Sequence, residues 1–153
     1  MGMPMFFVTC ILHSVIAITS GSLIIFHLDD DINIFAHGVE TSRNLSGSTP
    51  HDQLLVQTSN SLVGLLLCVV GFMVFMVAFV EDKEFQSFFA KGCILLHLSM
   101  ALWRVNFERR LEDLAWDWAT QAAGDLLLAL TWLFFLLHTC REKQDSVKKF
   151  SVN

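Results

Sequence analysis

The apolar segment Asn60–Val80, with the sequence NSLVGLLLCVVGFMVFMVAFV, decides the fold class of this 153-residue chain. No Asp, Glu, Lys or Arg lies between Asp52 and Glu81. A bilayer core about 30 Å thick is crossed by an α-helix of roughly 20 apolar residues. The segment therefore predicts a membrane-spanning helix.

Three further segments have a similar length and apolar character, and they cover residues 5–28, 88–107 and 119–140. The composition agrees, because 54% of the residues are hydrophobic and 16% are charged, whereas an average soluble domain has about 25% charged residues. The sequence thus predicts an all-α, integral membrane four-helix bundle with antiparallel up-down topology.

The predicted four-span domain covers residues 1–143, and a cytoplasmic tail follows over 144–153. The first span could also be a signal peptide, but no Lys or Arg precedes it and its apolar run continues through Leu23–Phe26. We therefore expect this segment to remain in the protein as a span. The third span contains Lys91 near one end and Arg104 near the other, where long cationic side chains can reach the headgroups.

A long polar loop over 29–57 separates the first two spans, and its end contains a helix start. Thr49 is suited to the N-cap, Pro50 to the first helical position and Asp52 to a capping-box partner. The second helix is therefore expected to begin near Pro50 and to project beyond the membrane.

The distribution of Lys and Arg favours an orientation with both termini in the cytoplasm. This orientation places six of them inside and four outside. The inner set is Lys83, Lys91, Arg141, Lys143, Lys148 and Lys149, and the outer set is Arg43, Arg104, Arg109 and Arg110. The outer loop would then contain the glycosylation sequon at Asn44. Cys140 would be juxtamembrane and cytoplasmic, which makes it a palmitoylation candidate, but we expect it to be a buried, inert thiol.

Small and polar residues of each span recur about every 3.5 positions and so share one helical face. These faces consist of Cys10, His13, Ala17, Ser20, Ile24 and His27; Ser61, Gly64, Cys68, Gly71, Phe75 and Ala78; Ala90, Cys93, His97, Met100 and Arg104; and Ala122, Asp125, Ala129 and Trp132. Helices that pack in lipid place such residues between them. The pattern predicts a compact, left-handed bundle with a partly polar interior.

Arg104 and Asp125 are the two charges inside the predicted spans that need a partner. Because their helices run antiparallel, both should lie at a similar depth, where an ion pair would offset the penalty of placing each charge in the membrane. The alternative is a polar ligand-binding end of a cavity, formed by both residues with Asn60 and Gln57.

His13 and His97 should also lie at a similar depth on inward faces. A bis-His haem site would require this arrangement, but the chain has one such pair and no haem-attachment motif. We expect hydrogen-bonding roles for both residues and no cofactor. The outer loop offers His and acidic residues, yet their spacing matches no ligand motif, so we expect no metal site.

The sequence excludes nucleic-acid binding and favours a non-enzymatic role. The net charge is −5, and no basic run exceeds Arg109–Arg110 or Lys148–Lys149. No catalytic residue is assigned, because nucleophile, zinc-protease and phosphate-loop patterns are missing from the sequence. We expect a scaffold or accessory subunit that contacts the lipid bilayer and other membrane proteins. Binding or transport of lipid or sterol through the polar interior is the alternative, and an intramembrane enzyme is a third possibility.

Several short stretches carry a resemblance to a plant family of small four-span membrane proteins of unassigned function. They are Ser48-Thr-Pro-His-Asp-Gln53, Gln57-Thr-Ser-Asn-Ser61, Glu84-Phe-Gln-Ser-Phe-Phe-Ala-Lys91, Trp103-Arg104 and Asp113-Leu-Ala-Trp-Asp-Trp118. In length and span number the chain also looks like the small four-span scaffold of the sterol-synthesis enzymes. This architectural likeness implies the endoplasmic reticulum or another endomembrane rather than the plasma membrane, and it assigns no residue roles.

Overall fold

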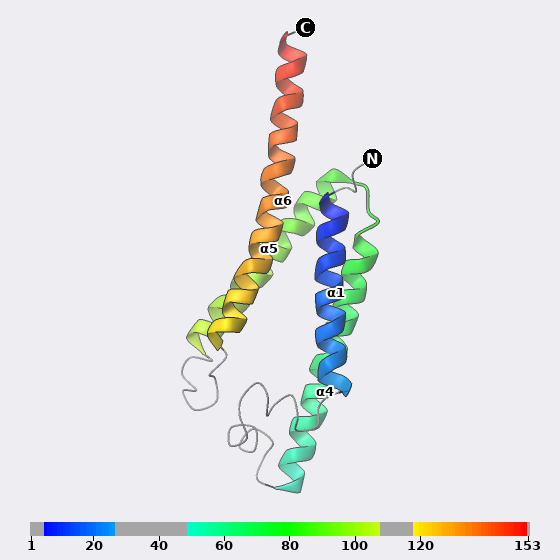
Figure 1. The fold of residues 1–153 in the computed structure, drawn as a ribbon, viewed down its shortest axis with the longest axis vertical. Helices are drawn as coiled ribbons and strands as arrows, with labels where there is room; N and C mark the ends of the chain where they lie inside the picture. The colour runs from blue at the N-terminus through cyan, green and yellow to red at the C-terminus, as the bar shows by residue number, and fades with distance from the viewer. Residues whose placement is uncertain (1–4, 27–48, 108–117, 153) are drawn as a thin grey trace.

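The computed structural model describes residues 5–26, 49–107 and 118–152, and these residues form four α-helices. The helices are α1 (Met5–Phe26), α4 (Pro50–Val77), α5 (Lys83–Asn106) and α6 (Trp118–Val152) (Figure 1). Successive helices run antiparallel, and all four are long and apolar enough to cross a membrane. The predicted all-α, four-helix, up-down fold is confirmed.

The capping box predicted before the second helix is present at the start of α4. The Thr49 hydroxyl accepts a hydrogen bond from the Asp52 backbone N–H at 3.2 Å, and an Asp52 carboxylate oxygen accepts one from the Thr49 backbone N–H at 3.3 Å. Pro50 occupies the first turn. A backbone N–H at this position has no partner within the helix, so the lack of one in proline costs no hydrogen bond. These local interactions fix the start of α4 outside its most apolar part.

Two helix ends differ from the predicted spans. Helix α5 begins at Lys83 instead of residue 88, because Asp82 caps it by accepting hydrogen bonds from the Glu84 and Phe85 backbone N–H groups at 2.8 and 3.4 Å. Helix α6 continues to Val152 instead of stopping near residue 140. The residues after Cys140 include no Gly or Pro, so polar helix formers extend the helix beyond its apolar part.

Helices α1 and α4 pack closely through glycines. A Cβ atom added to Gly64 would lie 2.8 Å from the Gly21 carbonyl oxygen, and one added to Gly21 would lie 2.5 Å from the Gly64 carbonyl oxygen. A Cβ atom at Gly71 would meet the Ile18 side chain at 2.7 Å. The two backbones therefore approach to a distance that only glycine permits, as expected for the small-residue face of the second span.

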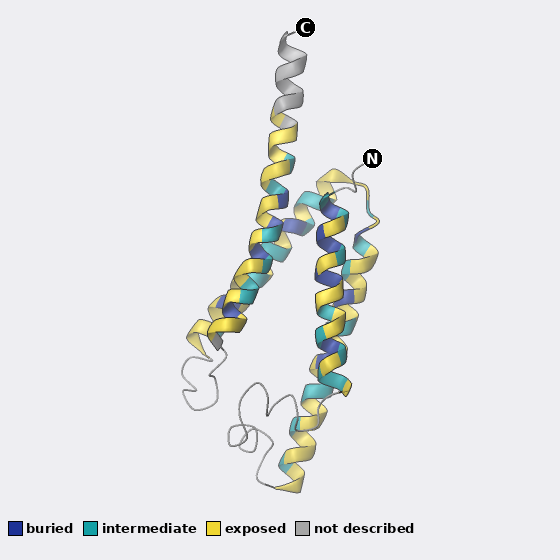
Figure 2. Cartoon of the chain, viewed as in Figure 1, coloured by how far each residue is buried: buried dark blue, intermediate teal, exposed yellow. Residues whose placement is uncertain are grey.

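Helices α5 and α6 form the second closely packed pair. Its buried positions include Ala90 and Ala101 on α5 and Ala122 and Ala129 on α6. The burial pattern of both pairs is visible in Figure 2 as a blue and teal face on each helix, with exposed positions around it. The exposed positions are largely Leu, Val, Phe and Met, which is the surface expected to face lipid.

The two pairs converge near the N-terminal half of α1 and diverge toward its C-terminal end (Figure 1). The junction is an aromatic cluster in which Phe6 of α1 contacts Phe89 of α5 and both Trp132 and Phe135 of α6. The described helices thus form two closely packed pairs that are joined at one end. Small residues bring the helices together within each pair, whereas bulky rings join the pairs at one end.

Candidate functional site

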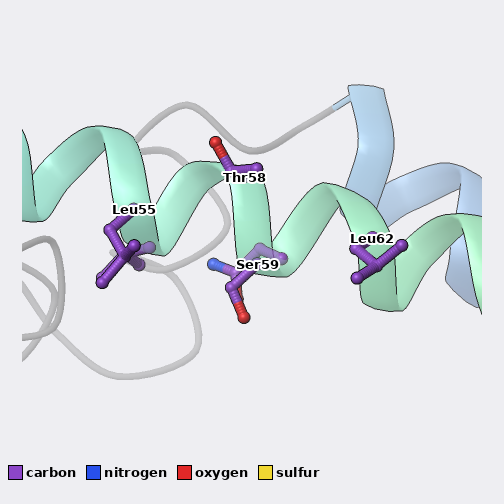
Figure 3. Close-up of a pocket in the computed structure, with 6 residues that line it drawn as sticks. Leu55, Thr58, Ser59 and Leu62 are labelled. Carbon is purple, nitrogen blue, oxygen red and sulfur yellow. The ribbon is translucent and has the colours of Figure 1, made fainter.

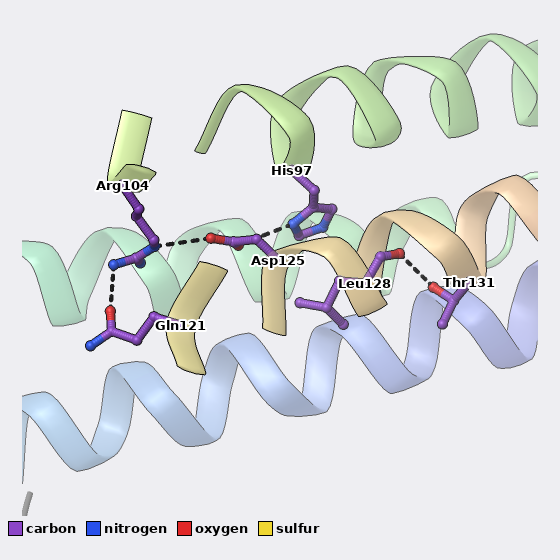
Figure 4. Close-up of polar contacts among 6 residues, drawn as sticks. All are labelled: His97, Arg104, Gln121, Asp125, Leu128 and Thr131. Atoms are coloured by element: carbon purple, nitrogen blue, oxygen red, sulfur yellow. Dashed lines mark hydrogen bonds and ion pairs between the residues drawn. The ribbon is translucent and has the colours of Figure 1, made fainter. Parts of the chain in front are cut away.

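Arg104, Asp125, Gln121 and His97 form a polar cluster between α5 and α6 (Figure 4). Arg104 Nε donates to Asp125 Oδ2 at 3.0 Å, and Arg104 Nη1 donates to Gln121 Oε1. His97 Nδ1 lies 3.5 Å from the other carboxylate oxygen, Asp125 Oδ1. The Asp125 carboxylate therefore has an Arg on one side and a His on the other.

The helix geometry explains why these side chains meet. Arg104 lies in the last turn of α5 and Asp125 near the start of α6, so the antiparallel arrangement places them at the same level. Gln121 precedes Asp125 by four residues and so lies on the same face of α6. The side chains of Arg104 and Asp125 are 19% and 15% exposed, which makes this a largely desolvated ion pair.

His13 of α1 extends this polar line toward the first helix pair. Its ring centroid lies 5.5 Å from that of His97 and 4.9 Å from that of Trp132. His13 Nδ1 lies 2.9 Å from the Thr9 carbonyl oxygen, one turn earlier in α1. The structure thus brings together His13, His97, Asp125 and Arg104, all of which the sequence pattern predicted on inward helical faces.

Two buried nitrogens beside this line have no hydrogen-bond partner. They are His13 Nε2 and Trp132 Nε1. Sequence analysis placed both residues on inward faces but gave no indication that these atoms would be unpaired. Gln121 was also missed, although its position one turn before Asp125 was the available signal.

Asn60, which the sequence suggested as part of a polar cavity with Arg104 and Asp125, lies on α4 and lines a different feature. It contributes to a pocket along α4 together with Leu55, Val56, Thr58, Ser59 and Leu62 (Figure 3). These residues belong to consecutive turns near the N-terminal end of that helix. The pocket lining includes neither Gln57 nor any member of the Arg104–Asp125 cluster.

Within the described ranges, no group of three or more His, Cys, Asp or Glu residues is placed to hold a metal ion. The four cysteines are free thiols. Cys10 is fully buried beside the aromatic cluster. The expectation of a buried Cys140 is wrong, because this residue is exposed on α6 beyond the packed part of the α5–α6 pair. The glycosylation candidate Asn44 and most of the acidic outer loop lie outside the described residues.

Comparison with known proteins identifies a protein family. No curated protein and no solved structure shows significant similarity to the chain. A family model described as a domain of unknown function, DUF7865, matches residues 1–133. This match includes α1, α4, α5 and the part of α6 that contains Asp125 and Trp132. The chain therefore belongs to the DUF7865 family.

Proposed function

We propose that this protein is a multi-pass membrane protein that acts as a scaffold or accessory subunit of a membrane complex. The observation that carries the proposal is the pairing of the interior charges with one another. Arg104 contacts Asp125 and Gln121, and Asp125 also contacts His97. Because Arg104 and Asp125 bind each other across two helices, their contacts support a structural role and not substrate binding.

The exposed surface of the helices supports the same role. Along α4 the exposed apolar side chains recur through the whole span, and they include Leu62, Leu65, Leu66, Val69, Phe72, Met73 and Met76. In a bilayer this surface contacts either lipid or the helices of other membrane proteins. Helix α6 extends to Val152, beyond its apolar part.

The proposal also includes the cellular membrane in which the protein resides and the side of that membrane on which its termini lie. We propose that both termini face the cytoplasm, because the distribution of Lys and Arg favours this orientation. The resemblance to small four-span plant proteins supports a plant origin, and the likeness to the sterol-synthesis scaffold supports an endomembrane location. The proposed partners are other membrane proteins and the bilayer itself.

Lipid binding is a second candidate function, and the α4 pocket is the observation that favours it. The pocket combines the apolar side chains of Leu55, Val56 and Leu62 with the polar side chains of Thr58, Ser59 and Asn60. A lipid with a polar headgroup and an apolar chain matches this mixture. This site differs from the polar bundle interior that the sequence suggested for a carrier.

Purification of the tagged protein from its native membrane in a mild detergent separates the two functions. The scaffold proposal predicts membrane proteins that copurify at constant stoichiometry and remain bound when Asn60 is replaced by Leu. A lipid carrier predicts instead a lipid that mass spectrometry detects in the wild type and that the Asn60→Leu variant loses. Recovery of the lipid without any stoichiometric protein would contradict the scaffold proposal.

A further inference from the structure

His97 of α5 faces an ionisable group on each of two other helices. On α6, Asp125 Oδ1 lies 3.5 Å from His97 Nδ1, and on α1 the His13 ring centroid lies 5.5 Å from that of His97. On α5 itself, Cys93 lies one turn earlier and Arg104 contacts the other oxygen of Asp125. His97 is therefore an imidazole held between a carboxylate and a second imidazole.

The contact between His97 and Asp125 is longer than a hydrogen bond between charged groups. Such N–H···O bonds measure about 2.7–2.9 Å, whereas His97 Nδ1 and Asp125 Oδ1 are 3.5 Å apart. A carboxylate oxygen only accepts, so the proton of the neutral ring lies on Nδ1, and a second proton would bind at Nε2. A positive charge on the ring would strengthen and shorten this contact.

A charged His97 has no need to displace Arg104 from the carboxylate. Arg104 Nε uses Asp125 Oδ2 at 3.0 Å, while His97 faces Oδ1 (Figure 4). The guanidinium of Arg104 also donates to Gln121 Oε1, so it has an acceptor besides the carboxylate. The two cations would therefore lie on opposite sides of one shared anion.

His13 limits the histidine pair to a single charge. Two imidazolium rings with centroids 5.5 Å apart would repel each other in a site that is largely removed from water. His13 is 8% exposed, and its Nδ1 lies 2.9 Å from the Thr9 carbonyl oxygen. Among the described contacts, it is His97 that has the carboxylate neighbour. The charge is therefore expected on His97, while His13 stays neutral.

Polar side chains connect His97 with the nearest ends of its helices. Arg104 lies in the last turn of α5, and Gln121 and Asp125 lie near the start of α6. His97 precedes Arg104 by seven residues, which corresponds to about 10 Å along the helix. Its side chain is 16% exposed. Protons from the aqueous phase at this end can thus reach His97 without crossing the aromatic cluster.

We infer that His97 is a proton-binding residue whose charged form draws Asp125 closer and tightens the α5–α6 pair under acidic conditions. This inference rests on the proposed function, because it assigns a regulatory proton to the cluster that holds these two helices together. The ligand is a proton from water, which binds at His97 Nε2 and leaves Nδ1–H to donate to Asp125. The adjacent His13 of α1 places this proton where the two helix pairs meet.

Nitrogen-15 NMR of histidine-labelled full chain in phosphatidylcholine nanodiscs tests the inference over the range from about pH 8 to pH 5, in which histidines titrate. We expect a neutral His97 with its proton on Nδ1 at the alkaline end and an imidazolium at the acidic end. The His13 ring should stay neutral throughout, and the carbon signal of the Asp125 carboxylate should remain that of an ionised group. The dipolar distance between His97 Nδ1 and the Asp125 carboxylate carbon should shorten on acidification.

An Asp125→Asn variant tests whether the carboxylate holds the proton. At the acidic end of the titration, its charged fraction of His97 should fall severalfold below that of the wild type. The matched control is Glu142→Gln, which removes the carboxylate 3.8 Å from His138. Because that pair is exposed, the charged fraction of His138 should change little.

Three results would overturn the inference. They are a His97 ring that stays neutral at the acidic end, an unchanged distance to Asp125 across the titration, and an equal charged fraction of His97 in Asp125→Asn. The first two come from the wild-type protein, so they do not depend on whether the variant folds. A neutral His97 in a protein that still copurifies with its partners refutes this inference alone, whereas the lack of partners at either pH refutes the scaffold proposal.

Discussion

Asp125 is the residue on which the interior of the second helix pair depends. Its two carboxylate oxygens face different partners, Arg104 at 3.0 Å and His97 at 3.5 Å. An isolated charge at the centre of a membrane span costs about 2.5–3.5 kcal/mol on insertion scales, and less near the end of the span. The intact ion pair therefore adds little net stability, whereas loss of one partner leaves a destabilising charge between the helices.

We expect Asp125→Asn to lower the free energy of unfolding by about 1–3 kcal/mol, because Arg104 would lose the carboxylate that accepts from its Nε. Denaturant unfolding in detergent or nanodiscs measures the loss. The matched control is Glu142→Gln on the same helix. It weakens the exposed His138–Glu142 pair, whose atoms lie 3.8 Å apart, and should change stability by less than about 1 kcal/mol. Equal losses in the two variants would contradict the buried role of Asp125.

At the residue scale, the sequence predicted that Arg104 and Asp125 lie at the same depth and that His13 and His97 lie on inward faces. It did not predict the contact between His97 and Asp125 that joins these two residue pairs. The unpaired nitrogens of His13 and Trp132 depend on ring orientation, which spacing does not determine. The aromatic core was also missed, since Phe is equally suited to lipid and to packing between helices.

At the scale of the elements, glycine contacts set the distance between α1 and α4. We expect Gly64→Ala to reduce stability by about 1–3 kcal/mol, because its Cβ would lie 2.8 Å from the Gly21 carbonyl oxygen and would force the helices apart. Gly124→Ala is the matched control, since nothing lies within 4 Å of its added Cβ. This control should be neutral or stabilising by up to about 1 kcal/mol. Similar thermal unfolding of both variants would show that the α1–α4 contact is looser than described.

The capping box at the start of α4 gives a second prediction at this scale. Thr49→Ala removes the hydroxyl that accepts from the Asp52 N–H at 3.2 Å and should cost about 1 kcal/mol, expressed as faster amide exchange in the first turn. Thr58→Ala is the control in the same helix, because the Thr58 hydroxyl donates to the Leu54 carbonyl oxygen within an intact helix. Unchanged exchange near Pro50 in Thr49→Ala would contradict the capping role.

The elements themselves were largely predictable, and the exceptions have clear causes. Regular helical spacing predicted buried Gly64, Gly71 and Ala78 correctly, but it also predicted inward positions for Phe75 and Met100, which are 38% and 39% exposed. The strict 3.5-residue spacing drifts from the actual helical repeat of 3.6. The early start of α5 and the long continuation of α6 depend on polar residues, which a search for apolar spans leaves outside.

At the scale of the whole molecule, the proposed orientation predicts the side from which Cys140 can be reached. Cys140 is exposed near the end of the fourth apolar helix, whereas Cys10 is buried. In sealed, cytoplasmic-side-out vesicles, a membrane-impermeant maleimide should label the wild type, and Cys140→Ser should abolish most of this labelling. Labelling that appears only after the vesicles are opened would reverse the orientation.

The arrangement of the two helix pairs was the part of the fold that sequence could not supply. Small residues on each span predicted close contacts, but they did not indicate that these contacts occur within the pairs α1–α4 and α5–α6. The junction is made instead by Phe6, Phe89, Trp132 and Phe135. Such a choice of partners depends on the three-dimensional fit of bulky rings, which one sequence does not specify.

We propose that Arg104 and Asp125 hold α5 and α6 together and do not serve a ligand. The most direct test is the double variant Arg104→Met with Asp125→Leu, which replaces the ion pair with apolar side chains. Its unfolding midpoint and copurifying molecules are compared with those of the wild type and of both single variants. We predict that the double variant recovers most of the stability lost in either single variant and keeps its protein partners. A folded double variant that loses its partners or a bound ligand would contradict the claim.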